Sequence, residues 1–308
     1  MKADALPVSD AVKRSVRNAK QAMREKNWAE AVSSWTEAVA GCAGQIPPPL
    51  QGITSALAFH RHAGLKVRCN LCGCPLFADR FGRKNIQCLS CLSLERTRLM
   101  GLYLQKLDIL RKDSRVLHIA PEQGIYEWAA SVVPPENYHL VDLDPEQYRF
   151  TPHVRAFNLC RDSENLPENY YDLILHSHVL EHVTCDYRQV LRHLHRAMKP
   201  EGWHVCIIPF MNGRYDECLT GLSREDAAAR FGDAEHVRRF GVKDIDDTLG
   251  RVLSFDRNFD ASADFPEAVL RAANVPETFW KGLTPNTVLR LRKSDFIDQD
   301  FAASKNGR

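Results

Sequence analysis

The chain has 308 residues, of which 44% are hydrophobic and 26% are charged. These fractions are those of an ordinary folded domain, so they exclude an intrinsically disordered chain. The formal net charge of +2 is too small to require a nucleic-acid or membrane partner, although basic residues crowd between Arg61 and Arg98.

No apolar run in the sequence approaches the length needed to span a membrane. Residues 1–20, MKADALPVSDAVKRSVRNAK, lack the apolar core of a secretory signal, so we expect a cytoplasmic protein without a membrane partner. The chain has ten cysteines. In a reducing compartment we expect them to be metal ligands or buried thiols rather than a disulfide framework.

Residues 9–40 contain two segments with small and aromatic residues at helical spacing, AVKRSVRNAKQAMREKN and WAEAVSSWTEAVAG. They predict a helical hairpin. Part of this text resembles a single tetratricopeptide unit, but no second clear copy follows, and such repeats need stacked neighbours. We therefore expect a hairpin packed on the rest of the protein, a further helix over residues 53–62, and a helical domain over residues 1–64. These helices are also a candidate surface for a protein partner.

Two Cys-x-x-Cys pairs follow in VRCNLCGCPLFADRFGRKNIQCLSCLSLERTRL. Cys69 and Cys72 form the first pair, Cys88 and Cys91 the second, and fifteen residues separate the pairs. This spacing predicts a zinc ribbon over residues 65–95, in which four thiolates complete a tetrahedron around a structural zinc ion. Cys74 suits neither turn and is expected to be a spare thiol. Four thiolates leave no open position for a substrate, and the metal would supply the folding energy of so small a module.

From Arg115 onward, strand and helix patterns alternate. Strands are predicted at VLHIA, YHLVDLD, YDLILHSH and GWHVCIIPF, and helices at YEWAASVV and CDYRQVLRHLHRAMKP. Such alternation predicts an α/β domain with a Rossmann-like, mostly parallel sheet that binds ligands at the carboxyl ends of its strands. The domain is expected to cover residues 96–308. Its last segments are RVLSFD, the helix-like PEAVLRAANV, and TVLRLRKS, which we expect to close the sheet.

Four pieces of this region resemble, in order, the class I S-adenosylmethionine-dependent methyltransferases of the type 11 kind. They are RVLHIAPEQG, YHLVDLDPE, FNLCRDSENLPENYYDLILHSHVLEHV and LHRAMKPEGWHVCIIPF. Four matches in register predict the fold more securely than any one of them. The ribbon followed by SLERTRLMGLYL and HIAPEQG is similar to a bacterial group in which an Ala-Pro-Glu turn replaces the usual glycines.

The resemblance implies that S-adenosylmethionine is the cofactor. It would place Ala120, Pro121, Glu122 and Gly124 against the methionine part of the cofactor, and Asp142, with Asp144 as a competing candidate, against the ribose. Asn158 and Leu159 would contact the adenine. Ser177 and His178, at the end of the fourth strand, would also contact the cofactor. An acid is commoner than asparagine at position 158. The cofactor carries an ammonium and a sulfonium but no phosphate, so a carboxylate at position 122 can replace glycines that serve phosphate binding. The alternative is a degenerate turn that binds nothing.

The segment LHSHVLEHV gathers His176, His178, Glu181 and His182, and the last three would share one face if a helix started after the strand. Three interpretations stay open. In the first, these residues only support the cofactor pocket, as in many methyltransferases. In the second, His178, Glu181 and His182, with His236 as a fourth ligand, bind a second divalent metal that positions a hydroxyl, as in the plant small-RNA 2′-O-methyltransferases that this pattern resembles. His-x-x-Glu-His is also the inverted zinc-peptidase motif, although that motif requires a long helix.

Methyl transfer needs alignment and the removal of a proton, and a histidine of near-neutral pKa suits the second task. The catalytic candidates are therefore His178, Glu181, His182 and His236. Glu181 would orient one of the histidines in this scheme.

Two classes of methyl acceptor fit the sequence. The one we expect is a hydroxylated small molecule or sugar. The other is RNA, since some ribosomal-RNA methyltransferases resemble this arrangement. Its phosphates would meet the basic residues of the ribbon and its flank, which are Arg80, Arg83, Lys84, Arg96 and Arg98. Only two aromatic residues, Phe77 and Phe81, lie among them to stack on bases. A non-catalytic adaptor with a degenerate methyltransferase domain is the alternative from a different class, and cofactor binding separates it from the enzymes.

Overall fold

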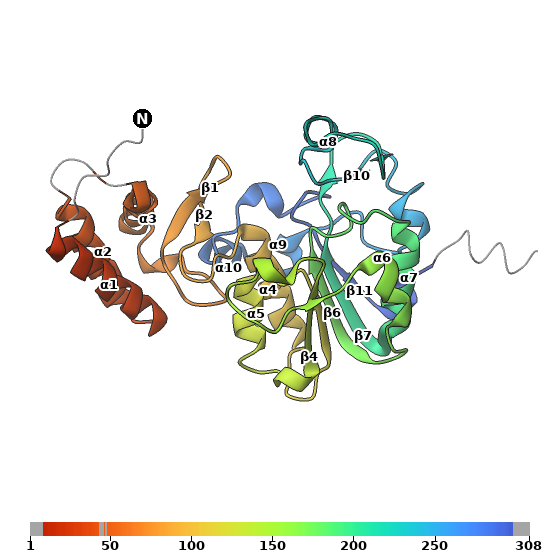
Figure 1. The fold of residues 1–308 in the computed structure, drawn as a ribbon, viewed down its shortest axis with the longest axis horizontal. Coiled ribbons are helices and arrows are strands. Elements are labelled where there is room, and N and C mark those ends of the chain that lie inside the picture. The colour runs from red at the N-terminus through yellow and green to blue at the C-terminus, as the bar shows by residue number, and fades with distance from the viewer. Residues whose placement is uncertain (1–8, 43–45, 47, 298–308) are drawn as a thin grey trace, which may run out of the picture. The chain divides into compact units, whose positions relative to one another are not determined.

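The computed structural model describes residues 9–42, 46 and 48–297 (Figure 1). The chain divides into two compact units, Met1–Arg98 with Glu267–Val275, and Leu99–Pro266 with Pro276–Arg308. The boundary falls inside helix α4 (Glu95–Leu107). The first unit groups the predicted helical segment with the predicted ribbon and adds a short segment from far along the chain. The domain limits expected at residues 64 and 95 stay predictions.

Three helices open the first unit: α1 (Asp10–Arg24), α2 (Trp28–Ala40) and α3 (Pro48–Ala63). Ser9 and Asn27 cap the first two through their side-chain oxygens, which accept from the backbone amides of Val12 and Glu30 at 3.3 Å. The predicted hairpin is confirmed. The third helix begins at Pro48, earlier than the predicted residue 53, because a proline in the first helical turn forfeits no hydrogen bond.

The hairpin of β1 (Phe77–Arg80) and β2 (Arg83–Cys88) follows the first cysteine pair and ends at Cys88, the first residue of the second pair. Its turn residues, Phe81 and Gly82, have φ of 51° and 70°, the left-handed conformation that tight hairpin turns require. Helix α10 (Glu267–Ala272) belongs to the same unit, as the amide of Arg68 donates to the oxygen of Ala272 at 2.8 Å.

A fully buried guanidinium holds these pieces of the first unit together. Arg98 donates to the backbone oxygens of Ala273, Ile86, Ser93 and Asn274 at 2.7 to 3.0 Å. Arginine is the side chain suited to this role because its five N–H groups are fixed in one plane. The sequence pattern put Arg98 among residues that would meet RNA phosphates, and that expectation is wrong, since the side chain has no exposed surface.

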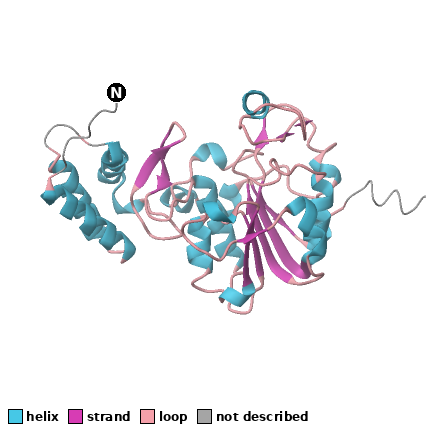
Figure 2. Cartoon of the chain, viewed as in Figure 1, coloured by secondary structure: helices cyan, strands magenta, loops and turns pink. Residues whose placement is uncertain are grey.

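A six-stranded sheet forms the centre of the second unit, with helices on its faces (Figure 2). Its order is β11-β7-β6-β3-β4-β5, and every neighbouring pair is parallel except β11 with β7. The strands are β3 (Val116–Ile119), β4 (Tyr138–Asp142), β5 (Arg155–Ala156), β6 (Tyr171–Ser177), β7 (Met198–Ile207) and β11 (Val288–Leu291). The predicted Rossmann-like α/β sheet is confirmed, and TVLRLRKS supplies the antiparallel strand that closes it.

Buried residues of α7 (Tyr187–Ala197) cover one face of this sheet. Val190, Leu191 and Leu194 lie in one apolar cluster with Ile174 of β6 and Cys206 of β7. The helices of this unit after α4 are α5 (Gln123–Ala129), α6 (Leu159–Asp162), α7 (Tyr187–Ala197), α8 (Arg224–Phe231) and α9 (Ala261–Asp264). Figure 1 shows α5 and α7 on opposite faces of the sheet. Such two-sided cover is why the central strands have nearly continuous apolar sequences.

A second, smaller sheet follows β7 in the chain. It has the order β8-β10-β9, from Phe210–Met211, Arg238–Gly241 and Asp216–Glu217. The central strand pairs in parallel with β8 and antiparallel with β9. This sheet carries the segment with His236 to the loop that follows β6. Among the described residues, no helix combines the length and the apolar character that crossing a bilayer requires.

Candidate active site

The chain order of the large sheet reverses between β3 and β6, because β4 and β5 continue on one side of β3 and β6 and β7 on the other. In open α/β sheets, ligands bind at the carboxyl ends of the strands beside such a reversal. The residues at these ends include Ala120 after β3 and Ser177, which ends β6. The cofactor-binding residues predicted from the sequence lie at or near this edge.

The Ala-Pro-Glu turn keeps the backbone path of a glycine turn without its glycines. Ala120 has φ of 51°, in the left-handed region where glycine is the usual residue, and its amide donates to Val141 of β4 at 2.9 Å. Pro121 is buried, Glu122 occupies the N-cap position of α5, and Gly124 is buried in the first turn of that helix. The turn is thus an ordered strand-to-helix connection, and it places the carboxylate of Glu122 at a helix N-terminus.

Asp142 and Asp144 differ clearly in environment. Asp142 ends β4, and its carboxylate accepts from the Tyr148 hydroxyl at 2.7 Å, the Asp144 amide at 2.7 Å and the Gln147 amide group at 3.1 Å. Asp144 is exposed and caps a short 3-10 turn by accepting from the amide of Glu146. Asp142 is therefore a half-buried, oriented carboxylate at the strand end, as a ribose contact requires. The sequence pattern did not reveal Tyr148.

The remaining cofactor candidates lie at the neighbouring strand ends. The amide of Phe157 donates to Asp142 at 2.8 Å and so brings the end of β5 to the end of β4. Asn158 caps α6 through the amide of Cys160 at 2.9 Å, and Leu159 is buried as the first residue of that helix. Ser177 is 9% exposed, and its hydroxyl has no hydrogen-bond partner among the described residues.

The segment that follows β6 is a loop rather than a helix. His178 has φ of 55°, and residues 179–185 form turns and bends. Its ring Nε2 donates to the oxygen of Pro285 at 2.9 Å, while its Nδ1 lies 3.4 Å from the carboxylate of Glu181. The expected common helical face is therefore absent, and the inverted zinc-peptidase motif loses the helix that it requires.

The loop nevertheless brings three of the four catalytic candidates together. Ligand atoms of Glu181, His182 and His236 lie within 4.8 Å of one another, and His178 is not part of this group. The rings of His182 and His236 are 4.7 Å apart between centroids. Each Nδ1 faces a backbone oxygen, that of Glu235 at 3.1 Å and that of Phe231 at 3.3 Å. A carbonyl only accepts, so each Nδ1 carries the proton and each Nε2 keeps a free lone pair.

Burial lowers the pKa of His236, and the neighbouring His182 lowers it further. A pKa below the ordinary value leaves the His236 ring neutral at physiological pH. Glu181 is fully buried, so its carboxylate lies in a low-dielectric site beside two imidazoles. Chemically, the group can accept a proton from a substrate hydroxyl or hold a divalent cation with two nitrogens and one oxygen.

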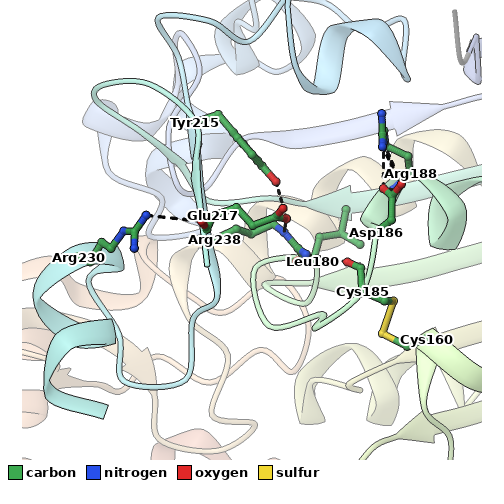
Figure 3. Close-up of polar contacts among 9 residues, drawn as sticks. All are labelled: Cys160, Leu180, Cys185, Asp186, Arg188, Tyr215, Glu217, Arg230 and Arg238. Carbon is green, nitrogen blue, oxygen red and sulfur yellow. Dashed lines mark hydrogen bonds and ion pairs between the residues drawn. A yellow bond between two sulfur atoms is a disulfide. The ribbon is translucent and has the colours of Figure 1, made fainter. Parts of the chain in front are cut away.

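A second buried guanidinium holds the loop in place (Figure 3). Arg238 of β10 donates to the backbone oxygens of Leu180 and, at 2.8 Å, Cys185, and it pairs with the carboxylate of Glu217 at 2.9 Å. The amide of Val237 also donates to the oxygen of Glu181 at 2.9 Å. The loop is therefore joined to β10 and the residue before it at Glu181 itself and at residues before and after Glu181 in the chain. No sequence motif indicated the role of Arg238.

The ten cysteines divide differently from the expectation. Cys160 and Cys185 form a disulfide, with their Cα atoms 5.8 Å apart, and this joins α6 to the loop after β6 (Figure 3). The prediction that the cysteines are ligands or buried thiols is wrong for this pair. It rested on compartment and count alone, whereas pairing requires two Cα atoms within about 7 Å, which the fold decides.

The four predicted ligands of the ribbon do come together. Their sulfur atoms lie within 4.8 Å of one another, with 3.6 Å between Cys69 and Cys91 and 3.5 Å between Cys72 and Cys88. Sulfurs around one zinc ion are about 3.8 Å apart, from a Zn–S bond of about 2.3 Å. The side chains therefore fit the metal. Hydrogen bonds from the other three thiols lower the pKa of Cys69. Cys74 lies outside the group, as its spacing predicted.

Comparison with known proteins agrees with this geometry. A family model described as a methyltransferase domain matches residues 93–249, about half of the chain. The fold and the strand-end site thus define a class I S-adenosylmethionine-dependent methyltransferase. The chain belongs to the methyltransferase-domain family. A search of the curated proteins found no match.

Several solved structures are similar in fold. An S-adenosylmethionine-dependent methyltransferase from Mesorhizobium loti is 15% identical with a TM-score of 0.41, over 63% of this chain and 96% of that one. A methyltransferase from Archaeoglobus fulgidus is 15% identical with a TM-score of 0.36, over 64% and 94%. The 1,6-didemethyltoxoflavin-N1-methyltransferase of Burkholderia thailandensis, with that substrate and S-adenosylhomocysteine bound, is 16% identical with a TM-score of 0.37, over 64% and 77%.

Proposed function

We propose that the protein transfers a methyl group from S-adenosylmethionine to an oxygen of a hydroxylated small molecule or sugar. The observation that carries this proposal is the convergence of Glu181, His182 and His236 next to the strand end that bears Ser177 and His178. A hydroxyl is a poor nucleophile until its proton is removed, and the imidazoles of this group can accept that proton.

Each residue has a distinct task in this proposal. The cofactor supplies a methyl carbon already activated by a sulfonium. Glu122 and Asp142 hold its cationic and ribose parts. His236 accepts the hydroxyl proton at Nε2, because its Nδ1–H is held by the oxygen of Phe231 and its lowered pKa keeps the ring neutral. Glu181 stabilises the resulting imidazolium within a buried site.

The same three residues also fit a divalent metal in a second version of the proposal. Two Nε2 lone pairs and one carboxylate are a familiar ligand set for zinc and for other first-row metals, and both rings are oriented by backbone oxygens. When bound, the ion would lower the pKa of the acceptor hydroxyl. His178 was one of the four ligands in the sequence-based scheme, and we instead propose it as a support for Glu181, whose carboxylate lies 3.4 Å from its Nδ1.

The choice of a small polar acceptor rests on a cavity beside the Arg238 network. Most residues around this cavity of about 350 Å³ carry a hydroxyl or a charge, including Tyr215, Glu217, Asp247 and Thr248, although more of its wall is apolar than polar. The group of Glu181, His182 and His236 does not line it. The Tyr215 hydroxyl donates to Glu217 at 2.7 Å, and Glu217 pairs with Arg238. The volume lies at the small end of ligand pockets, and the lining suits a ligand with several hydroxyls.

RNA is the less favoured acceptor because several of the residues expected to meet it are buried or paired, although Arg80 and Lys84 are exposed. Arg98 and Phe77 are fully buried, so neither can contact a phosphate or stack on a base. Arg83 forms an ion pair with the buried carboxylate of Glu95. Of the two aromatic candidates only Phe81 is exposed, at 67%. One exposed ring does not make the stacking platform that single-stranded RNA requires.

Titration calorimetry with S-adenosylmethionine and S-adenosylhomocysteine, together with methyl transfer to a panel of sugars and small alcohols, tests the proposal. We expect micromolar cofactor binding and a loss of at least about 100-fold in turnover for His236→Ala, the scale of a general base. His62→Ala, at an exposed histidine of α3, is the matched control. Transfer to RNA alone would refute the acceptor. Failure of the folded protein to bind either cofactor form would refute the site and leave the adaptor.

We also propose that Cys69, Cys72, Cys88 and Cys91 hold a structural zinc ion. Arg98 lies beside this group, since it donates to the oxygen of Ser93, whose hydroxyl is 3.2 Å from the Cys69 sulfur. A buried cation there offsets the net negative charge of four thiolates around one zinc ion. Zinc content and chelator-induced unfolding of the first unit are the corresponding measurements.

A further inference from the structure

A second group of possible metal ligands lies on one face of the large sheet. His176 of β6 and His204 and Cys206 of β7 place their ligand atoms within 4.8 Å of one another. The strand register pairs His176 with Cys206, and His204 precedes Cys206 by two residues, so all three side chains point to the same face. All three are at most 1% exposed.

The ring nitrogens of this group lack the partners that buried polar atoms normally have. Neither nitrogen of His176 and not Nε2 of His204 has a hydrogen-bond partner among the described residues. Each such atom costs about 1 to 3 kcal/mol when it leaves water, and natural cores contain few of them. A neutral imidazole keeps a lone pair on one of its two ring nitrogens. An ion that takes up these lone pairs offsets that cost.

One histidine of the group has a partner on its other nitrogen. Nδ1 of His204 lies 3.2 Å from Nε2 of His195, a buried residue of α7. Metal-binding histidines usually have such a contact, because it fixes the ring orientation and the tautomer. The contact leaves Nε2 of His204 as the atom that faces the other two ligands.

We propose that His176, His204 and Cys206 bind a thiophilic transition-metal ion, zinc or copper(I), inside the methyltransferase sheet. Two imidazoles and a thiolate form a soft ligand set that does not suit magnesium or calcium. Nitrogen and sulfur ligands around one such ion lie about 3.3 to 3.6 Å apart in a tetrahedral site, so this group, whose ligand atoms lie within 4.8 Å of one another, needs only a small contraction to bind it. With one thiolate and two neutral imidazoles, copper(I) gives a site without net charge, whereas zinc gives a site with one positive charge. Burial of that charge costs free energy, so the zinc site is the more costly of the two to bury.

The site would serve stability rather than chemistry. It is enclosed by the cluster of α7 and β11 side chains that covers this face of the sheet, and it has no exposed ligand. The ion would bind as the sheet forms and would join β6 to β7 at His176, the residue just before Ser177 and His178 in the chain. The inference does not rest on the proposed acceptor or on a metal at Glu181, His182 and His236.

Metal analysis of the purified full chain, by mass spectrometry with protein quantified by amino-acid analysis, tests the proposal. We expect Cys206→Ala and His204→Phe each to lose one equivalent of zinc or copper relative to the wild type. His118→Phe is the matched control, because His118 is equally buried but has its own partner, the Tyr138 hydroxyl at 2.8 Å. Wild-type and Cys206→Ala proteins with the same metal content would overturn the inference.

A second measurement covers the case in which the core variants do not fold. This measurement is X-ray absorption at the zinc and copper edges on the His182→Ala variant, in which the substitution disrupts the group of Glu181, His182 and His236 and leaves the core residues unchanged. We expect nitrogen as well as sulfur around the bound ions. Sulfur alone, as the ribbon supplies, would refute the core site and would leave the proposed methyl transfer unaffected.

Discussion

Replacement of Arg238 by methionine removes one guanidinium from the interior and keeps most of the side-chain volume. Arg238 is fully buried and donates to Leu180, Cys185 and Glu217. The change removes the Arg238 donor from both backbone oxygens and leaves that of Leu180 with only a long bond of 3.4 Å from the Val183 amide. Glu217 is less affected, because it is 32% exposed and keeps the Tyr215 hydroxyl.

The magnitude follows from these contacts. A hydrogen bond from a charged donor contributes about 1.5 to 3 kcal/mol, and breaking a buried ion pair from one side costs about 3 to 5 kcal/mol. Partial hydration of Glu217 reduces the second figure, so we expect Arg238→Met to lower the free energy of unfolding by about 3 to 4 kcal/mol. For a domain of this size, that corresponds to a melting temperature lower by roughly 10 °C.

Denaturant unfolding of the full chain at neutral pH measures this loss. Arg224→Met is the control, because Arg224 pairs with Glu235 at 3.3 Å on the surface, with 70% and 63% of the two side chains exposed, and such pairs contribute at most about 1 kcal/mol. A destabilisation by Arg238→Met no greater than that of the control would refute the reasoning. Turnover should fall as well, because the loop that Arg238 holds carries Glu181 and His182.

Three further predictions concern the second unit. Burial raises the pKa of Asp264, but hydrogen bonds from Lys106 and other basic groups outweigh it and lower the pKa below its usual value. The resulting stability is present above about pH 4, the unfolded value, and is lost as the pH falls through the folded value, so Asp264→Asn should flatten the acid limb of a stability-pH curve. An unchanged limb would contradict this assignment. The disulfide of Cys185 closes a loop with a sequence separation of 25, so Cys185→Ser should cost about 3 kcal/mol under oxidising conditions and abolish the effect of a phosphine reductant on unfolding. Asp142→Asn should weaken S-adenosylmethionine binding about tenfold in calorimetry, because a neutral amide accepts weaker bonds from ribose hydroxyls, whereas Asp144→Asn should bind normally. The reverse order would make Asp144 the ribose contact.

Local sequence determined the elements of this protein and most of the candidate cofactor edge. Apolar runs of strand length and helical periodicity depend on residues close in the chain, so the order of strands and helices was readable without the fold. The pairs Cys69 and Cys72, and Cys88 and Cys91, were recognisable because a tight metal-binding turn requires a fixed spacing. The turn at Ala120 was located from its position after a strand, although its left-handed backbone was not.

Only the tertiary structure decided which distant residues meet. His236 was identified as a candidate from sequence, but its contact with Glu181 and His182 depends on β10, which Arg238 joins to the loop. The buried roles of Arg98 and Arg238, the Cys160–Cys185 bond and the group of His176, His204 and Cys206 join segments with no shared motif. Their pairing costs loop-closure entropy that only the packing of the complete sheet repays, so no local pattern encodes it.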